Sequence, residues 1–389
     1  MKDESDATAA KDDGQFGLGT FGVKPQEREL MSSDSHFEYD YSQVRPAHSY
    51  PRTPPNVMNA HSADRDMLRW LFRTCAEPTV KAPSEGYIYV ERGFLFDGKH
   101  ILGEDGAWLP ATICDWNPSG QIDAHVRSLI ATGRIENLQV CDETTFLVHF
   151  AQVNIWNYGH FLCENAPKLM NIAKAGLRVV RILYPEEAAY TVGFVTDILA
   201  ALGVRAEITP LAPGSLVPFR ALLHFTPVAK HNFRKSRALL ELRDVALTLY
   251  GGKPDGRPVF ITRPETGRRR LSNQSQVSAY LEGHGYCAID PGRLSLAEQV
   301  RVFSGAERIV GSVGAGLTNI LYAPSGADIA YLCNGIIDLF FWDIAGLCDL
   351  RFSWIFAATP RPWTPEDYVQ DYTMSLDVLR INLDQLGMV

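Results

Sequence analysis

The sequence contains no uninterrupted apolar run of the roughly 18 residues that a membrane-spanning helix requires. Its first residues, MKDESDATAAKDDG, are acidic and lack the apolar middle region of a secretory signal. The seven cysteines are odd in number and scattered, and none belongs to a CxxC pair, which excludes a zinc site and a disulfide framework. We therefore expect a cytoplasmic protein whose thiols stay reduced and mostly buried.

The chain also lacks an excess of basic residues. Its 37 Lys and Arg residues stand against 45 Asp and Glu residues, which gives a net charge of -8. A dedicated nucleic-acid-binding protein usually shows the opposite balance, so no nucleic-acid partner is expected. The length of 389 residues, with 46% apolar and 21% charged, indicates a globular protein that is too long for a single hydrophobic core.

The residue pattern predicts a tail followed by two α/β halves and a final helix. Residues 1–60 are rich in Asp, Ser, Pro and Gly without periodicity, which predicts a disordered tail that the fold does not need. Strand and helix patterns alternate over 61–250, restart at 257 after the linker GGKPDG, and continue to 360. A helix is expected over 361–389. This alternation predicts largely parallel sheets and a ligand cleft between the halves, at the carboxyl ends of the strands.

A glycine-rich turn, GSVGAGLTN, follows the strand pattern RIV and opens a helix. Gly311, Gly314 and Gly316 let the backbone approach a ligand closely, and the N–H groups at a helix start attract phosphate. The spacing is neither the GxGxxG dinucleotide fingerprint nor a P-loop, because no GK followed by Ser or Thr is present. The turn therefore predicts a phosphate site, with a tight packing turn as the alternative.

The segment NYGHFLCENAP places Asn157, His160, Phe161 and Glu164 on one face of an expected helix. An imidazole one turn away from a carboxylate can act as a base that its neighbour orients. The alternative is a buried histidine paired with a glutamate for structural reasons.

An arginine-rich segment, RPETGRRRLSN, follows the strand pattern PVFIT and therefore lies beside the expected cleft. The planar guanidinium groups of Arg263 and Arg270 suit phosphate, although a solvated charge run is the alternative.

Two further charge clusters are interpreted as structural. Asp64-Arg-Asp66 matches the DxD metal–nucleotide signature of other transferases, but it precedes an amphipathic helix and is interpreted as a helix cap. A basic cluster at a helix start is interpreted as a solvated face; its members are Lys230, Arg234, Lys235 and Arg237.

In their order along the chain, the three motifs resemble those of glycosyltransferase family 61. That family has NYxHW followed by Glu and a proline-containing helix, an R…RRxLxNE loop, a Q-rich helix and GxHGAGLTN. The matching segments here are NYGHFLCENAPKL, Arg263 with RRRLSNQ, LSLAEQVRVFSGA and GSVGAGLTN. The resemblance extends over about 156–333. This sequence departs from the pattern at Phe161, Gln274 and Val313, where Trp, Glu and His are usual.

The resemblance implies a GT-B-type fold, with two Rossmann-like halves facing a cleft. It also implies inverting, metal-independent and cofactor-free transfer of a hexose or pentose. The sugar would pass from a nucleotide-sugar donor to a hydroxyl of a glycan or lipid-linked acceptor, in bacterial surface-polysaccharide assembly such as capsule formation. A position at the periphery of the membrane stays open. A dinucleotide-binding enzyme is disfavoured because the GxGxxG motif is missing.

Within that mechanism, the first half supplies the base and the second half holds the donor. His160 and Glu164 are the expected catalytic pair, and the sequence does not separate base from orienting group. The expected substrate-binding residues are Asn157, Arg263, Arg270, Asn273, Gly314, Ala315, Gly316, Thr318 and Asn319. Val313 removes a side chain expected to face the donor, which leaves open a degenerate, non-catalytic binding protein of the same assembly system.

Overall fold

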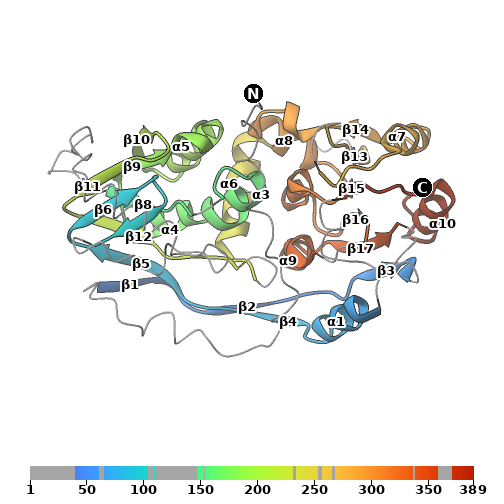
Figure 1. Cartoon of the computed structure of the whole chain (residues 1–389), viewed down its shortest axis with the longest axis horizontal. Coiled ribbons are helices and arrows are strands. Elements are labelled where there is room, and N and C mark those ends of the chain that lie inside the picture. The colour runs from blue at the N-terminus through green and yellow to red at the C-terminus, as the bar shows by residue number, and fades with distance from the viewer. Residues whose placement is uncertain are drawn as a thin grey trace, which may run out of the picture.

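The computed structural model describes residues 40–60, 65–103, 109, 112, 147–152, 154–230, 234–252, 256–264, 268–335, 338–357 and 370–389. These residues form a mixed α/β structure with two six-stranded sheets and helices packed around them (Figure 1). Within this described part, no helix combines the length and the apolar character needed to cross a bilayer.

The first sheet has the strand order β1-β5-β12-β8-β9-β10. The bounds are β1 Asp40–Arg45, β5 Glu85–Val90, β12 Leu222–Phe225, β8 Leu147–His149, β9 Val179–Pro185 and β10 Arg205–Leu211. Strands β12, β8, β9 and β10 are parallel, whereas β5 and β1 pair antiparallel at one edge. When these four parallel strands are numbered by their order in the chain, their order across the sheet from β10 to β12 is 3-2-1-4. Dinucleotide-binding sheets have this strand order.

The second sheet has the order β14-β13-β15-β16-β17-β3, and every neighbouring pair is parallel. The bounds are β14 Cys287–Ile289, β13 Val259–Ile261, β15 Arg308–Ser312, β16 Asp328–Cys333, β17 Arg351–Phe356 and β3 Asn56–Met58. The first five strands run 2-1-3-4-5 in chain order, which is the second common order of doubly wound sheets.

Helices connect the parallel strands, as the alternation predicts. In the first half these are α3 Tyr158–His160, a π-helix Phe161–Asn165, α4 Lys168–Lys174, η6 Glu186–Thr191 and α5 Val192–Ala201. Helix α6 Ala238–Tyr250 leads to the second half, which contains α7 Gln274–Glu282, η7 Pro291–Arg293, α8 Leu296–Phe303, η8 Ala315–Tyr322 and α9 Leu339–Cys348. Small sheets β11-β6-β7 and β2-β4 complete the strands: β2 His48–Pro51, β4 Thr79–Ala82, β6 Gly93–Phe96, β7 His100–Leu102 and β11 Leu216–Phe219.

The prediction of a disordered tail to about residue 60 was wrong for residues 40–58. Strand β1 pairs with β5 in the first sheet, and β3 pairs with β17 in the second, so this segment runs along both halves (Figure 1). Between β1 and β3 in the chain lies β2, which pairs with β4. Strand β2 precedes helix α1 (Arg65–Cys75), and β4 follows it. Short polar strands such as these are stabilised by distant partners and carry no apolar period of their own. Residues 1–39 lie outside the described residues.

The C-terminal helix is also shorter than predicted over 361–389. Helix α10 (Leu376–Gln385) begins at its N-cap Ser375, whose side chain accepts a hydrogen bond from the backbone N–H of Val378. Tyr372 forms an isolated parallel bridge to Leu271, so the chain before the cap is extended. Residues 358–369 lie outside the described residues.

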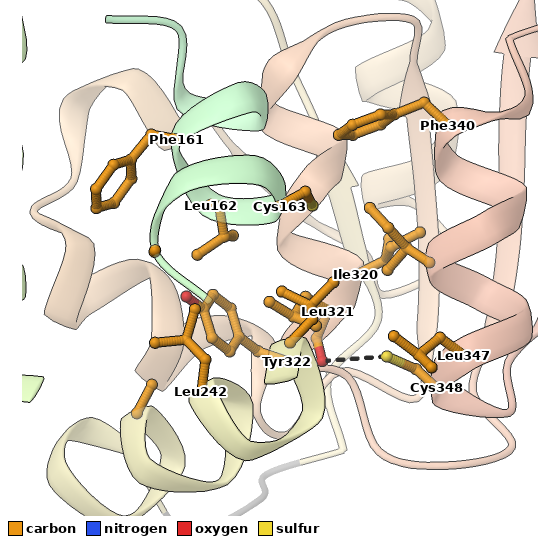
Figure 2. Packing of buried hydrophobic residues seen from close by; sticks show 14 of the residues in the cluster. Phe161, Leu162, Cys163, Leu242, Ile320, Leu321, Tyr322, Phe340, Leu347 and Cys348 are labelled. Atoms are coloured by element: carbon orange, nitrogen blue, oxygen red, sulfur yellow. Dashed lines mark hydrogen bonds between the residues drawn. The ribbon is translucent and has the colours of Figure 1, made fainter. Parts of the chain in front are cut away.

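The two halves share one hydrophobic core. The cluster combines residues of the π-helix and α6 with residues of η8 and α9 (Figure 2). Its members at this junction include Phe161, Leu162, Cys163, Leu242, Ile320, Leu321, Tyr322, Phe340, Leu347 and Cys348. Separating the halves would expose this apolar surface to water, so the interface holds them together.

A buried charge cluster ties the N-terminal segment to this junction. Asp343 of α9 is fully buried and forms ion pairs with Arg52 at 2.6 Å and with Lys235 at 3.6 Å. Arg52 also lies over the ring of Trp342, and Lys235 over the ring of Phe340. Burial raises the pKa of Asp343, while the charges of Lys235 and Arg52 oppose that rise. The interpretation of the basic cluster as a solvated face was therefore wrong for Lys235, whose side chain is 0% exposed.

We expect Arg52→Ala to lower the free energy of unfolding by about 3–5 kcal/mol, because it breaks a buried ion pair and leaves the buried Asp343 with the more distant cation Lys235, at 3.6 Å. The control is Arg69→Ala, which removes an ion pair with Asp66 whose side chains are 70% and 85% exposed. That change should cost less than about 1 kcal/mol. Urea unfolding followed by circular dichroism measures both, and equal losses would contradict the role given to Arg52.

Candidate active site

The strand order of each half predicts a crevice at its topological switch point. In a doubly wound sheet, ligands bind at the carboxyl ends of the two neighbouring strands from which the chain leaves in opposite directions. In the second sheet these are β13 and β15, and Arg263 follows β13 while Gly314 follows β15. In the first sheet they are β8 and β12, and α3 with His160 follows β8. The motifs singled out from the sequence therefore lie at the two topological switch points.

Arg263 lies directly against the glycine-rich turn. Its guanidinium donates hydrogen bonds to the carbonyl oxygens of Val313 and, at 3.1 Å, of Arg268. Gly314 has φ of 156°, and a Cβ atom at this position would collide with the Arg263 guanidinium. The backbone conformation thus favours glycine, and a side chain at this position would displace the Arg263 guanidinium from the turn.

Gln274 fixes the backbone of the same arginine. Its Oε1 accepts a hydrogen bond from the Arg263 N–H at 2.8 Å, and its Nε2 donates to the Arg263 carbonyl at 2.9 Å. Only an amide supplies both an acceptor and a donor, whereas an ionised carboxylate only accepts. The departure from the usual Glu at this position therefore has a structural explanation. Burial and the charge of Arg269 lower the pKa of Arg263.

The glycine-rich turn opens a 3₁₀-helix, η8, rather than an α-helix. Gly314, Ala315 and Gly316 are half-buried, and the first N–H groups of a helix have no acceptor within it. This part of the turn has the geometry expected of a phosphate site.

Thr318 and Asn319, in contrast, are fully buried. The Asn319 amide donates to Gln299 at 2.8 Å and to the carbonyl of Gly316, and its oxygen accepts from the hydroxyl of Tyr158 at 2.7 Å. Asn319 thus connects η8 to α8 and to α3 and has a positioning role. The sequence analysis missed Tyr158 and Gln299, although both lie within the quoted motifs.

His160 and Glu164 form the pair that their spacing predicts. The Nδ1 atom of His160 lies 2.9 Å from Oε2 of Glu164, with side chains 20% and 12% exposed. Glu164 lies in the π-helix, in which Ala166 donates to the carbonyl of Phe161, and such single turns recur at functional sites. Asn165, which the sequence analysis did not single out, donates to the carbonyl of His160 at 3.0 Å.

The N-terminal end of α3 explains two further positions. Asn157 is the N-cap, and its side chain accepts a hydrogen bond from the N–H of Gly159 at 3.0 Å. Gly159 packs closely on η8, because a Cβ atom there would lie 3.1 Å from Oγ1 of Thr318. The side chain of Asn157 therefore has a local structural partner in addition to its expected substrate role.

Arg270 and Asn273 are held by the C-terminal segment. Asp371 accepts hydrogen bonds from the Arg270 backbone N–H and from Nε of its guanidinium, at 2.7 and 2.8 Å, and these bonds lower the pKa of Asp371. Asn273 pairs with the backbone of Met374 through both its amide nitrogen and its oxygen. The structure thus places Arg263 against the glycine-rich turn, whereas the contacts described for Arg270 are with Asp371. No sequence signal marked Asp371.

Among the described residues, one surface hollow lined by charged groups lies away from the two switch points. This hollow, which includes Arg308, Asp328 and Arg351, lies at the amino ends of β15, β16 and β17, the opposite edge from the crevice. In the described ranges, no group of three or more His, Cys, Asp or Glu side chains could hold a metal ion. Of the DxD sequence, Asp64 lies outside the described residues, and Asp66 lies in the first turn of α1.

A family model for glycosyltransferase 61 matches residues 158–330. The chain therefore carries a glycosyltransferase family 61 domain. The matched region begins at α3 and ends in β16, so it contains the His160–Glu164 pair, Arg263 and the glycine-rich turn. Comparison with curated proteins gives no match.

Val313 provides a test of this geometry in the glycosyltransferase 61 domain. Its side chain is 1% exposed within the shared apolar cluster. The expectation that this position faces the crevice was therefore wrong. We expect Val313→His to lower the free energy of unfolding by about 2 kcal/mol or more, because it buries a polar ring among apolar groups. Donor affinity should not rise.

The matched control for this test is the same exchange at the surface. Val179→His on β9, where the valine is 58% exposed, should change stability by less than about 0.5 kcal/mol. Urea unfolding and titration with a nucleoside diphosphate measure both quantities. Tighter nucleotide binding by the Val313→His variant would show that this position does face the donor.

Proposed function

We propose that the chain is an inverting, metal-independent glycosyltransferase of the GT-B type. It moves a sugar from a nucleotide-sugar donor to a hydroxyl of a glycan or lipid-linked acceptor. One observation carries this proposal: a histidine–carboxylate pair follows the switch point of one sheet, and an arginine beside a glycine-rich helix start occupies that of the other. The Tyr158–Asn319 hydrogen bond holds the two elements against each other. The two doubly wound strand orders support the GT-B assignment.

In the proposed reaction, the second half binds the diphosphate of the donor. The guanidinium of Arg263 carries five N–H donors, and its bonds to Val313 and Arg268 use only part of them. The N–H groups of Ala315 and Gly316 add the positive end of a helix. Both would stabilise the negative charge that grows on the leaving diphosphate, a task that a metal ion performs in other transferases.

The first half supplies the base. In this proposal Nδ1 of His160 stays bonded to Glu164, and Nε2 takes up the proton. The acceptor oxygen attacks the anomeric carbon while the bond from that carbon to the diphosphate oxygen breaks, and the hydroxyl proton passes to Nε2 of His160. Glu164 keeps the ring oriented and stabilises the imidazolium that results. His160 is thus the base and Glu164 the orienting group.

The cellular role is part of the same proposal. We place the enzyme in bacterial surface-polysaccharide assembly, with its donor in the cytoplasm and its acceptor at the membrane periphery. The non-catalytic alternative depended on Val313, and the burial of that side chain favours the catalytic assignment over it.

A thermal-shift screen of nucleotide sugars identifies the donor, because a ligand that binds the native state raises its stability. With that donor, His160→Ala and Glu164→Gln should lower kcat by roughly 10²–10⁴-fold while the donor Kd changes little. His284→Ala, an exposed position after α7, is the control and should keep full activity. Near-normal turnover by the His160→Ala variant would remove His160 from the mechanism.

Calorimetric titration tests the donor site and its independence of metal. A nucleoside diphosphate should bind equally well with and without EDTA. Arg263→Ala should weaken binding by about 1.5–3 kcal/mol, the loss of a charged hydrogen bond. Arg270→Ala should weaken it less, because the Arg270 guanidinium pairs with Asp371. Binding that disappears with EDTA, or a larger effect at Arg270, contradicts this arrangement.

A further inference from the structure

Two large aromatic side chains are exposed beside the candidate active site. Trp156 is 53% exposed and Tyr190 is 51% exposed. Tryptophan is highly buried on average in folded proteins. Two exposed aromatic residues that a hydrogen bond joins are therefore a candidate ligand-binding surface.

The chain places both residues at the carboxyl edge of the first sheet. Trp156 directly precedes Asn157, the N-cap of α3, and His160 lies four positions after Trp156, which limits their Cα distance to about 14 Å. Tyr190 lies in η6, which follows β9, and β9 pairs with β8 in the sheet.

A hydrogen bond joins the two positions. The Tyr190 hydroxyl donates to the backbone carbonyl of Trp156 at 3.2 Å. The phenol ring is thereby anchored next to the turn that carries the indole. Trp156 directly precedes the helix that carries the proposed base, so a ligand stacked on the two rings would lie close to the start of that helix.

We propose that Trp156 and Tyr190 form an acceptor platform on which a pyranose ring of a neutral glycan stacks. This inference rests on the proposed function and names the acceptor class for that site. One face of a pyranose presents polarised C–H groups, which pack on the electron-rich face of an aromatic ring. The hydroxyl groups at the ring's edge stay hydrated or point toward the base.

The charges around the platform favour a neutral sugar. Glu186 and Glu187 lie on the same short helix as Tyr190, and both residues are exposed. Glu187 pairs with Lys99 at 2.9 Å, which leaves this helix with acidic rather than basic character. A phosphorylated or uronic-acid acceptor would meet repulsion here, whereas a neutral chain would not.

Saturation-transfer NMR of the full chain tests the platform with maltohexaose, laminarihexaose, xylohexaose and N-acetylchitohexaose as probes. At least one hexaose should receive magnetisation at its ring C–H protons. Trp156→Ala should weaken that binding about tenfold, the size of one aromatic stacking contact. Trp156→Phe should restore most of it. The control is Phe72→Ala, an equally exposed aromatic residue (55%) on α1, and it should have no effect.

A parallel titration with UDP, GDP and CDP separates the two proposals. Nucleotide binding without contact to any hexaose overturns the platform and leaves the proposed function standing. Hexaose binding that depends on Trp156, without nucleotide binding, supports the platform and contradicts the proposed function. Failure of both ligands overturns both.

Two other occupants of the surface are tested with the same variants. If Trp156→Ala abolishes sedimentation with vesicles of phosphatidylglycerol and phosphatidylethanolamine but leaves hexaose binding intact, the surface binds lipid and the proposal is wrong. A dimer that the same substitution converts to monomers, again with hexaose binding intact, also overturns it.

Discussion

The fully buried amide of Asn319 constrains how the two halves meet. Its oxygen accepts from Tyr158 of α3, and its nitrogen donates to Gln299 of α8 and to Gly316 of the glycine-rich turn. A buried amide that loses a partner costs about 1–3 kcal/mol, so α3 and η8 are held in one register. The positions of His160 and of the glycine-rich turn both follow from that register, and the surrounding apolar junction excludes water from it.

The elements that could be predicted well from the sequence are those stabilised by residues close together in the chain. Strand β9 and helix α5 each show their own hydrophobic pattern, and α5 is followed at Gly203 by the positive φ that favours glycine. The His160–Glu164 pair could be predicted because its members are four residues apart. The hydrogen bond between Arg270 and Asp371 could not be predicted. Its partners are 101 positions apart, and no sequence pattern around either residue indicates the other.

The local helix type was also beyond prediction. The π-helix Phe161–Asn165 has the same residue types as an ordinary helix, and only the packing of its buried side chains shows why it widens. Asn165 ties this helix to the segment before it, since its oxygen accepts a hydrogen bond from the backbone of Gln152 and its nitrogen donates to the carbonyl of His160. A rigid scaffold of this kind keeps the imidazole oriented without help from a ligand.

The path of strand β3 has a consequence for the order of folding. Asn56 of β3 donates a hydrogen bond to Ser353 of β17, a partner 297 residues later in the chain. During synthesis on the ribosome, β3 emerges early and has no strand to pair with until almost the whole polypeptide is made. Until then β3 stays unpaired and open to mispairing with other chains. Closure of so long a loop makes the docking of β3 a late event, and the sheet that carries the proposed donor site is the last to be completed.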